Sequence, residues 1–415
     1  MRNWAGNISY AAEGVARPTD VDELRRVVAG HAHVKALGSR HSFNDSADTT
    51  GIQVSLAAMP RALEVDTAAR TVTSSAGISH ADLSDALHRR GLSMSNLASL
   101  PHISVGGAIQ TGTHGSGAHN PALSAAVTSV QIVDAEGETR CLTRGDEDFD
   151  AVVVGLGAFG VVHAVTQEVV AAFDVEQRVF EGVRWSALLP VLDDVMSSAY
   201  SVSLFSRFDS DHVHQVWVKR KVTDPDPVDL SALGGAESRV PVHPVPGTGA
   251  ENVTDQLGAR GPSFTRLPHF RPEFRPGRGD ELQSEYFVDA RRGVEAIDAV
   301  RDLGSLVAPL LHIAEIRRIA PDRAWLSPSG DRDSLAVHFT WRALPREVAE
   351  LLPVLEAALL PLGARPHWGK LFAYSHAALR GVYPRLDDFA ALVREYDPRG
   401  TFDNAFLRRV LGATG

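Results

Sequence analysis

Separate segments of this chain carry residue types that could do chemistry on a polar small molecule. His41 stands in the loop of residues 38–42, directly after a short apolar run. Glu315 and Arg317 are two residues apart, and Lys370 ends a Trp-Gly-Lys triplet. A carboxylate accepts hydrogen bonds, whereas a guanidinium and an ammonium donate them and stabilise a developing alkoxide. These types predict a site that binds a polar small molecule and stabilises developing negative charge on it.

The loop around His41 could hold a phosphate or the edge of a planar ring. A tight turn lets successive backbone N–H groups converge on a ligand, and Gly38 removes the Cβ that would block close approach. A buried or capping histidine is the commoner structure for an isolated Gly-x-x-His. The interpretation therefore depends on the rest of the chain.

Residues 96–117 form a second stretch in which small residues dominate. A diphosphate needs several N–H donors and hydroxyls with no bulky Cβ nearby, and this stretch offers them; a flexible loop is the alternative. His102 and His114 could suggest a metal site, but we expect no metal, because no carboxylate pair or cysteine accompanies them. The residues that suit a diphosphate are Gly112, Thr113, Gly115, Ser116 and Gly117.

Glu315, Ile316 and Arg317 follow an apolar run and read as part of a strand. Side chains at i and i+2 share one face, so Glu315 and Arg317 point the same way while Ile316 packs behind them. A surface ion pair is the commoner structure for an isolated Glu-x-Arg. In the Trp-Gly-Lys triplet, Gly369 permits close approach to a planar ring and Lys370 can lie beside negative charge; a turn with a solvated lysine is the alternative.

Lysine is rare in this arginine-rich chain. The lysines are Lys35, Lys219, Lys221 and Lys370. Most of this bias is genomic, but a position that needed only a positive charge would usually have drifted to arginine. The rarity therefore singles out Lys370.

Composition excludes several classes of protein. With 415 residues, 44% of them hydrophobic and 22% charged, the chain is long enough for two folded domains. A formal charge of −10 argues against a nucleic-acid partner, whose phosphates require clustered Lys and Arg. Cys141 is the one cysteine, so neither an intrachain disulfide nor a cysteine metal cluster can form. No run of about 20 apolar residues appears, so we expect a cytoplasmic protein without a membrane or an obligate protein partner.

The elements that must position these residues follow an α+β pattern. Capped helices are predicted at 21–28 and 79–90, strands at 34–37 and 52–56, and hairpins at 63–73 and 127–142. Residues 155–160 match G-x-G-x-x-G, but the β-branched segment after them is unsuited to a helix. We therefore interpret them as a turn between strands and not as an NAD-binding motif.

The second half of the chain predicts longer strands around a Pro- and Gly-rich stretch at 224–261. Strands are expected at 201–205, 215–218, 283–287 and 337–341, and helices at 292–307 and 345–360. We place a domain boundary near residue 173. No internal repeat is evident.

Taken together, the chain resembles the bacterial alditol oxidases, a family of FAD-dependent oxidoreductases of the vanillyl-alcohol-oxidase type. The likeness runs from Asn3 to Asn404 and is most specific in the segments 38–44, 98–104, 111–117, 315–317, 338–341 and 366–370. It implies a mixed α+β FAD-binding domain (1–172), an antiparallel-sheet substrate or cap domain (173–370) and a C-terminal return to the FAD-binding domain (371–415).

The resemblance also implies roles for single residues. FAD is linked covalently through His41 to the 8α-methyl of its ring, and the terminal carbinol of a polyol lies over flavin N5. Catalytic roles fall on Glu315, Arg317 and Lys370, and substrate contacts on Ser99, Glu315, Arg317, Thr340 and Lys370. Cofactor contacts fall on Gly38, Ser39, Arg40, His41, Ser42, Ser99, Ser104, Gly107, Thr111, Gly112, Thr113, His114, Gly115, Val162 and His367, with Gly160 also near the cofactor.

The implied reaction converts a primary hydroxyl of xylitol, sorbitol or a similar alditol to an aldehyde, with hydride transfer to N5 and peroxide formed from O2. Arg40 stands where such loops commonly have glycine. Ala98 belongs near the face at which oxygen reacts, which leaves a dehydrogenase using another acceptor open. The alternatives are an aldonolactone oxidase or dehydrogenase and, from a different class, a non-catalytic flavin-binding protein.

Overall fold

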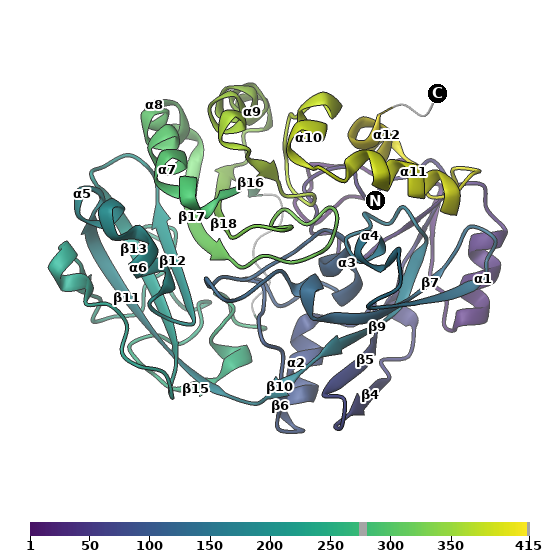
Figure 1. The fold of residues 1–415 in the computed structure, drawn as a ribbon, viewed down its shortest axis with the longest axis horizontal. Coiled ribbons are helices and arrows are strands. Elements are labelled where there is room, and N and C mark those ends of the chain that lie inside the picture. Colours follow the sequence, from purple (N-terminus) through teal and green to yellow (C-terminus); the bar gives the residue numbers. More distant parts are fainter. Residues whose placement is uncertain (274–279, 413–415) are drawn as a thin grey trace.

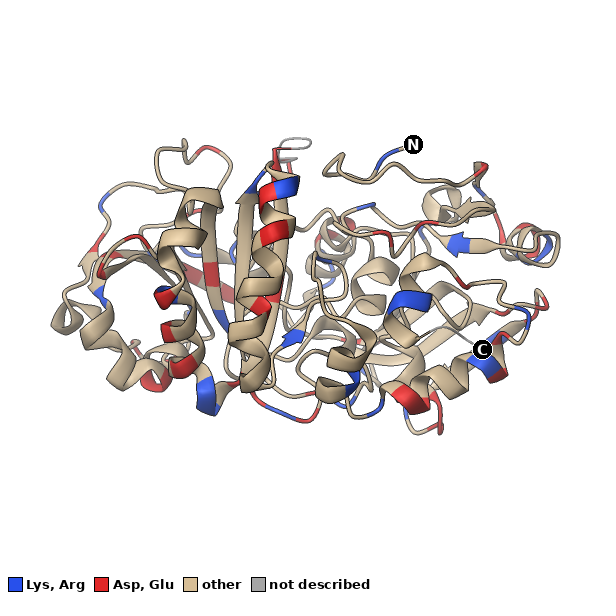
Figure 2. Ribbon diagram, turned by 90° about the horizontal axis from the view of Figure 1, so that it is seen from above, with Lys and Arg blue, Asp and Glu red and all other residues tan. Residues whose placement is uncertain are grey.

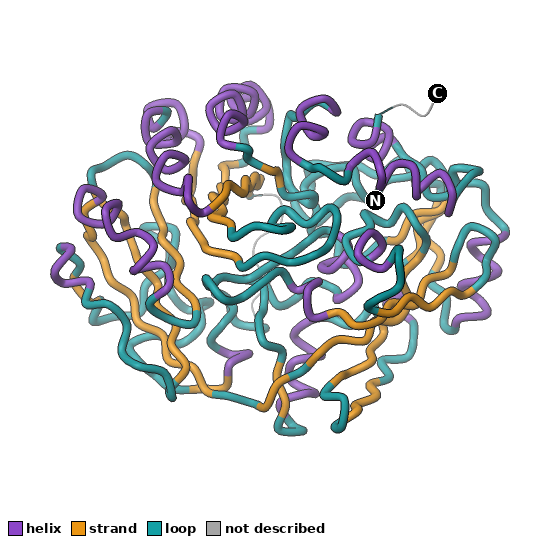
Figure 3. The backbone as a smooth tube through the Cα atoms, in the orientation of Figure 1, coloured by secondary structure: helices purple, strands orange, loops and turns teal. Residues whose placement is uncertain are grey.

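A computed structural model gives the structure of residues 1–273 and 280–412 (Figure 1). Two antiparallel sheets, one in each half of the molecule, dominate this described part. In Figure 3 the region between the sheets consists mainly of loops. The predicted α+β class, with a mixed first half and an antiparallel sheet in the second half, is confirmed.

The first half of the chain builds the smaller sheet. Its strand order is β4-β5-β9-β7-β8, and all neighbours are antiparallel. A parallel set, β1-β3-β2, and the short pair β10-β6 lie beside it. The strands are β1 (Gly14–Ala16), β2 (Val34–Ala36), β3 (Ile52–Val54), β4 (Leu63–Asp66), β5 (Thr71–Ser75), β6 (Leu92–Ser93), β7 (Val127–Val133), β8 (Thr139–Thr143), β9 (Val161–Glu168) and β10 (Val170–Ala171).

The helices of this half begin where capping residues predict. In α1 (Val21–Ala29), the side chain of Asp20 accepts from the N–H of Glu23, and in α2 (His80–His88) the side chain of Ser79 accepts from that of Asp82. Both helices had been predicted from these caps. The short helices α3 (Val105–Gln110) and α4 (Phe149–Val152) complete this half.

The second half builds a larger sheet with the order β14-β11-β13-β12-β17-β18-β16-β19, to which β15 adds through β11. The interior strands are buried almost throughout, because helices cover one face of the sheet and loops cover the other (Figure 1). The strands are β11 (Asp174–Arg184), β12 (Ser201–Ser206), β13 (His212–Lys221), β14 (Ala236–Glu237), β15 (Gly261–Pro262), β16 (Glu281–Asp289), β17 (Leu311–Ile319), β18 (Ser334–Arg342) and β19 (Arg365–Pro366).

Helices α5 (Trp185–Leu188), α6 (Leu192–Ser197), α7 (Gly293–Asp302), α8 (Gly304–Val307) and α9 (Pro345–Leu359) belong to this half. On α9, Glu356 is buried, and its Oε1 accepts from Tyr286 Oη and from the N–H of Ala373, each at 2.7 Å. Burial raises the pKa of Glu356 to about 7, although both hydrogen bonds act against the rise.

The chain ends in α10 (His376–Val382), α11 (Leu386–Tyr396) and α12 (Ala405–Leu411), beside the N-terminal segment (Figure 1). Asn404 caps α12 through the N–H of Leu407 and donates to the carbonyl of Asp48 at 2.8 Å. The N–H of Val34 donates to the carbonyl of Thr401 at 2.8 Å. The sheets change over between Ala171 and Asp174, but the bounds at residues 172 and 370 stay a prediction.

Two expectations need correction. The helix expected at 292–307 is two helices, because the chain breaks at Leu303 before α8 begins. The turn at 155–160 leads into strand β9, as expected, but follows helix α4 and not a strand. The valines at 152–154 continue that helix end, because Val152 and Val153 keep helical backbone bonds to Asp148 and Phe149.

Charges of both signs are distributed over the two halves of the molecule (Figure 2). Within the described ranges, no helix is long and apolar enough to cross a membrane.

Candidate active site

A cavity of about 680 Å³ lies between the two halves, within the size range of ligand pockets. The predicted cofactor residues that line it are Gly38, Ser39, Arg40, His41, Ser42, Ser99, Ser104, Gly107, Thr111, Thr113, His114, Gly160, Val162 and His367. The predicted substrate residues Glu315, Arg317, Thr340 and Lys370 line it from the cap side. Segments more than 300 residues apart thus meet at one cavity.

The histidine loop is bonded directly to the Trp-Gly-Lys segment. The N–H of Phe43 donates to the carbonyl of Gly369 at 2.8 Å, and Asn44 Nδ2 donates to the carbonyls of Trp368 and Lys370 at 2.7 and 2.8 Å. These bonds fix the position of Lys370 relative to the loop that carries His41. Trp368 itself is fully buried in the core and does not face the cavity.

The loop conformation explains a departure noted in the sequence. Arg40 has a φ of 67°, in the left-handed region that favours glycine, so a glycine at this position of related loops relieves strain. The carbonyl of Arg40 accepts from the N–H of Trp4 at 2.8 Å, and the Trp4 ring stacks on His41 with centroids 5.2 Å apart. The loop keeps its shape with arginine because the N-terminal segment holds it.

Two predicted cofactor residues do not reach the cavity. Among the described residues, Gly112 and Gly115 are absent from its lining. A Cβ on Gly112 would lie 3.0 Å from Pro328, and one on Gly115 would lie 2.2 Å from Oδ1 of Asn96. Their small size therefore serves packing against protein atoms, and their contact with a cofactor stays a prediction.

Sheet register places three polar residues in one row across the cap. Glu315 on β17 pairs with His338 on β18, and His338 pairs with Glu285 on β16. Directly paired residues of adjacent strands project their side chains to the same face. The row faces the cavity, and Arg317, two residues after Glu315, shares its side of the sheet.

Glu285 is the centre of the charge network. Its Oε1 accepts from Arg317 Nη2 and its Oε2 from Lys370 Nζ, each at 2.5 Å. His114 Nε2 lies 3.3 Å from Oε1. Burial alone raises the pKa of Glu285, but the charges of Arg317 and Lys370 outweigh it and hold the pKa well below its usual value. Glu285 is therefore an anion that orients two cations.

Lys370 also contacts His338 and helps to determine the protonation state of its ring. Lys370 Nζ lies 2.7 Å from His338 Nδ1, and His338 Nε2 lies 3.1 Å from Thr340 Oγ1. Burial and the charge of Lys370 lower the pKa of His338 well below its usual value. A neutral imidazole with Nδ1 as the acceptor for Lys370 fits this geometry.

Glu315 and Arg317 also lie where the sequence predicts. Ile316, between them, is fully buried on the other face, as expected. Arg317 Nε is 3.7 Å from Glu315 Oε2, and Arg317 Nη1 donates to Ser99 Oγ at 3.3 Å. The Ser99 contact links the two halves of the molecule across the cavity.

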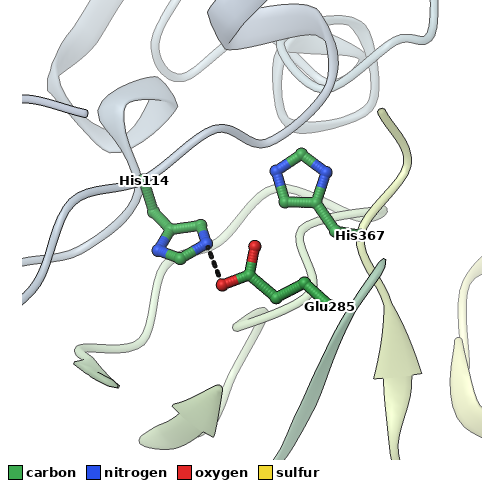
Figure 4. A group of neighbouring side chains, drawn as sticks. All are labelled: His114, Glu285 and His367. Carbon is green, nitrogen blue, oxygen red and sulfur yellow. Dashed lines mark ion pairs between the residues drawn. The ribbon is translucent and has the colours of Figure 1, made fainter. Parts of the chain in front are cut away.

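His114, Glu285 and His367 converge so that one ligand atom of each lies within 4.8 Å of the others (Figure 4). The sequence places no carboxylate pair near His114, but folding brings one carboxylate, Glu285, beside it. Both oxygens of Glu285 already bind cationic side chains. A divalent cation would lie against those positive charges, so the electrostatics disfavour a metal.

Sequence reasoning missed Glu285, His338 and His269 as parts of the site. His269 Nε2 lies 2.7 Å from Oε1 of Glu315. The signal that could have found Glu285 is a charged residue inside an otherwise buried strand, between Ser284 and Tyr286. The rarity of lysine singled out Lys370 alone, but Lys219, another of the four lysines, proves to be buried.

Comparison with known proteins agrees with this geometry. Residues 12–143 match the FAD binding domain family, and residues 280–410 match the D-arabinono-1,4-lactone oxidase family. The alditol oxidase of Streptomyces sp. is 46% identical over 414 residues, covering 99% of each chain. This chain belongs to the alditol oxidase family. It is therefore an FAD-dependent oxidoreductase of the vanillyl-alcohol-oxidase type.

More distant relatives share the full length. The L-gulono-1,4-lactone dehydrogenase of Mycobacterium tuberculosis is 31% identical, covering 99% of this chain and 98% of its own. The crystal structure of cholesterol oxidase from B. sterolicum superposes with a TM-score of 0.75 at 14% identity, covering 99% and 96% of the two chains. The latter likeness concerns the fold alone.

The walls of the cavity fit FAD. Gly38 packs so closely on Ser104 that a Cβ there would lie 2.5 Å from the Ser104 Oγ. This Oγ is buried and finds no hydrogen-bond partner among the described residues, although it borders the cavity. A hydroxyl left in this state suits a polar group of a bound cofactor.

Proposed function

We propose that this protein oxidises the terminal primary hydroxyl of alditols such as xylitol and sorbitol to the aldose, with O2 as the final acceptor and H2O2 as the second product. FAD, when bound, accepts the hydride and passes the electrons to oxygen. The observation that carries the proposal is the cluster of two buried carboxylates, Glu285 and Glu315, with the cations Arg317 and Lys370 on one cavity wall.

A polyol offers only hydroxyl groups, so a selective site must supply both acceptors and donors. In our proposal Glu315 accepts from the hydroxyl next to the reacting carbinol, and Thr340 and Ser99 complete the hydroxyl contacts. Burial raises the pKa of Glu315, but the charge of Arg317 opposes this effect, and the pKa stays below its usual value. Glu315 then remains an acceptor throughout the neutral range.

Arg317 and Lys370 are proposed to hold the reacting oxygen. Two cations beside that oxygen stabilise the negative charge that grows as the hydroxyl proton leaves. Glu285 keeps both cations oriented without neutralising either completely. The neutral Nδ1 of His338, 2.7 Å from Lys370 Nζ, accepts a hydrogen bond from the ammonium and helps to hold it in place.

The covalent link is part of the same proposal. His41, stacked on Trp4, would hold the cofactor through one ring nitrogen, while the lining residues of the histidine loop and of 99–114 contact the rest. A cytoplasmic location and action without an obligate protein partner also belong to the proposal. Cell fractionation and the mass of the purified protein in solution test those two points.

A lactone is the second candidate substrate, because residues 280–410 match a lactone oxidase family. A ring lactone has fewer free hydroxyls than an open alditol, so it leaves more of the charged wall unpaired, at about 1–3 kcal/mol for each unmatched group. Oxidation of an alditol should therefore depend on Glu315 more strongly than oxidation of a lactone.

Anaerobic reduction of the flavin, followed by its absorbance, tests the proposal. Xylitol and sorbitol should bleach the wild-type flavin at concentrations at which L-gulono-1,4-lactone does so slowly. Glu315→Gln should slow bleaching by the polyols much more than bleaching by the lactone. Bleaching by the lactone alone would transfer the assignment to the lactone enzymes.

A further inference from the structure

A row of buried polar side chains runs from Glu315 through His269, which also lines the cavity, to Lys219, which among the described residues is not part of the lining. His269 Nε2 lies 2.7 Å from Glu315 Oε1, and His269 Nδ1 lies 3.0 Å from Lys219 Nζ. All three residues are at most 5% exposed. The roles proposed above for the charged wall use neither Lys219 nor the histidine ring.

The surroundings of Lys219 suit an ammonium. Its Nζ donates to the carbonyls of Leu267 and Pro268 at 2.6 and 3.1 Å, and to the ring of His269. Three acceptors match the three hydrogens of the charged form. Burial lowers the pKa of Lys219 to about 7, against the attraction of Glu315, which raises it.

The row fixes the tautomer of His269. Nε2 faces a carboxylate oxygen, which can only accept a hydrogen bond, so the ring hydrogen lies on Nε2 and Nδ1 accepts from Lys219 Nζ. That hydrogen points at Glu315 Oε1, a carboxylate oxygen. This hydrogen bond keeps Glu315 ionised and oriented. The histidine binds Oε1, so Oε2 faces Arg317.

Packing holds His269 in this orientation. The rings of Trp217 and Phe205 lie edge-on to its imidazole, with centroids 5.3 and 5.5 Å away. The backbone N–H of His269 donates to the carbonyl of Ser99 at 3.1 Å. One residue therefore supports Glu315 through its ring and Ser99 through its backbone.

We propose that Lys219 and His269 form a positioning pair that fixes the orientation and acceptor state of Glu315, and so sets the preference for substrates with a hydroxyl next to the reacting carbinol. This inference rests on the proposed function, because it assumes that Glu315 contacts that hydroxyl. It adds two residues that act through Glu315 and touch no reacting atom.

The test compares propane-1,2-diol with propan-1-ol, which differ only in the vicinal hydroxyl. Lys219→Met and His269→Leu should each lower kcat/KM for the diol by roughly tenfold or more, mainly through KM, and leave propan-1-ol little changed. His269→Gln retains an acceptor for Lys219 and a donor for Glu315, so it should restore most of the preference. Lys221→Met, on the same strand, is the matched control.

A merely structural role would lower kcat/KM for both alcohols equally in the Met and Leu variants, and an unchanged diol preference would overturn the proposal. The tautomer gives a second test that needs no turnover. The ¹⁵N shifts of His269, assigned by their loss in His269→Gln, should show protonated Nε2 and unprotonated Nδ1. A hydrogen on Nδ1 would overturn the positioning pair, whereas the expected tautomer in a protein inactive on both alcohols would remove only the proposed function.

Discussion

Replacing Glu285 by glutamine tests the charge network at its centre. The carboxylate of Glu285 binds Arg317 and Lys370 at 2.5 Å each, with its side chain fully buried. Glutamine keeps the volume but directs an amide N–H₂ donor at one of the two cations. Breaking a buried ion pair costs about 3–5 kcal/mol, and here two cations lose their partner. We expect Glu285→Gln to lower the free energy of unfolding by at least about 3 kcal/mol.

The same change should reduce catalysis. If about 3 kcal/mol of the lost interaction is expressed at the transition state, kcat falls about 100-fold, because 1.36 kcal/mol corresponds to a factor of ten. The charge of Glu285 also raises the pKa of Lys370 against the lowering effect of burial. Without it the ammonium loses its proton at lower pH, so the alkaline limb of kcat/KM should move to lower pH.

Urea unfolding and flavin-reduction kinetics measure these effects. Glu281→Gln is the matched control, because Glu281 lies on the same strand and face, and its Oε1 accepts from the amide of Gln283. The control should stay within about 1 kcal/mol of the wild type. Equal unfolding midpoints and equal kcat for Glu285→Gln and Glu281→Gln would refute the idea that Glu285 orients the cations.

The remaining predictions concern the cofactor link, the catalytic lysine and a buried carboxyl. His41→Ala should release its flavin on acid precipitation while His102→Ala, on the same cavity, retains it; flavin still bound to the chain in His41→Ala would reject the link. Lys370→Met should reduce kcat by about 10²–10³-fold, and Lys221→Met should not; an unchanged turnover number in the former would remove its catalytic role. The pKa of Glu356 is raised to about 7, so wild-type stability should fall between pH 5 and pH 7, by up to about 3 kcal/mol. Glu356→Gln should abolish this fall in urea unfolding curves, and a fall that persists in the variant would assign it to other groups.

Local patterns were sufficient to predict most elements of the fold. The caps at Asp20 and Ser79 marked helix starts, and an apolar run indicated the strand that carries Glu315. The prediction of one helix over 292–307 was wrong because the helix breaks locally at Leu303. A run of valines does not distinguish a helix from a strand, because such runs occur in buried helices and in buried strands.

The candidate site was predictable only in part, because its centre depends on sheet register. Glu285, His338 and Glu315 meet because β16, β18 and β17 are neighbours, although the first and last strands do not pair with each other. The residues next to Glu285 in the sequence do not indicate that it pairs with Arg317 or Lys370. Most residues that the family likeness indicated line the cavity, although Gly112 and Gly115 do not, whereas the ion-pair partner Glu285 became visible only in the fold.

Peroxide release by the purified yellow protein under air, with xylitol and sorbitol beside L-gulono-1,4-lactone, distinguishes an alditol oxidase from its alternatives. We expect one equivalent of H2O2 for each polyol molecule oxidised and little from the lactone. Flavin that bleaches with polyol anaerobically but yields little peroxide under air would contradict the oxidase and indicate a dehydrogenase restricted near Ala98. Peroxide from the lactone alone would contradict the assignment of alditols as substrates.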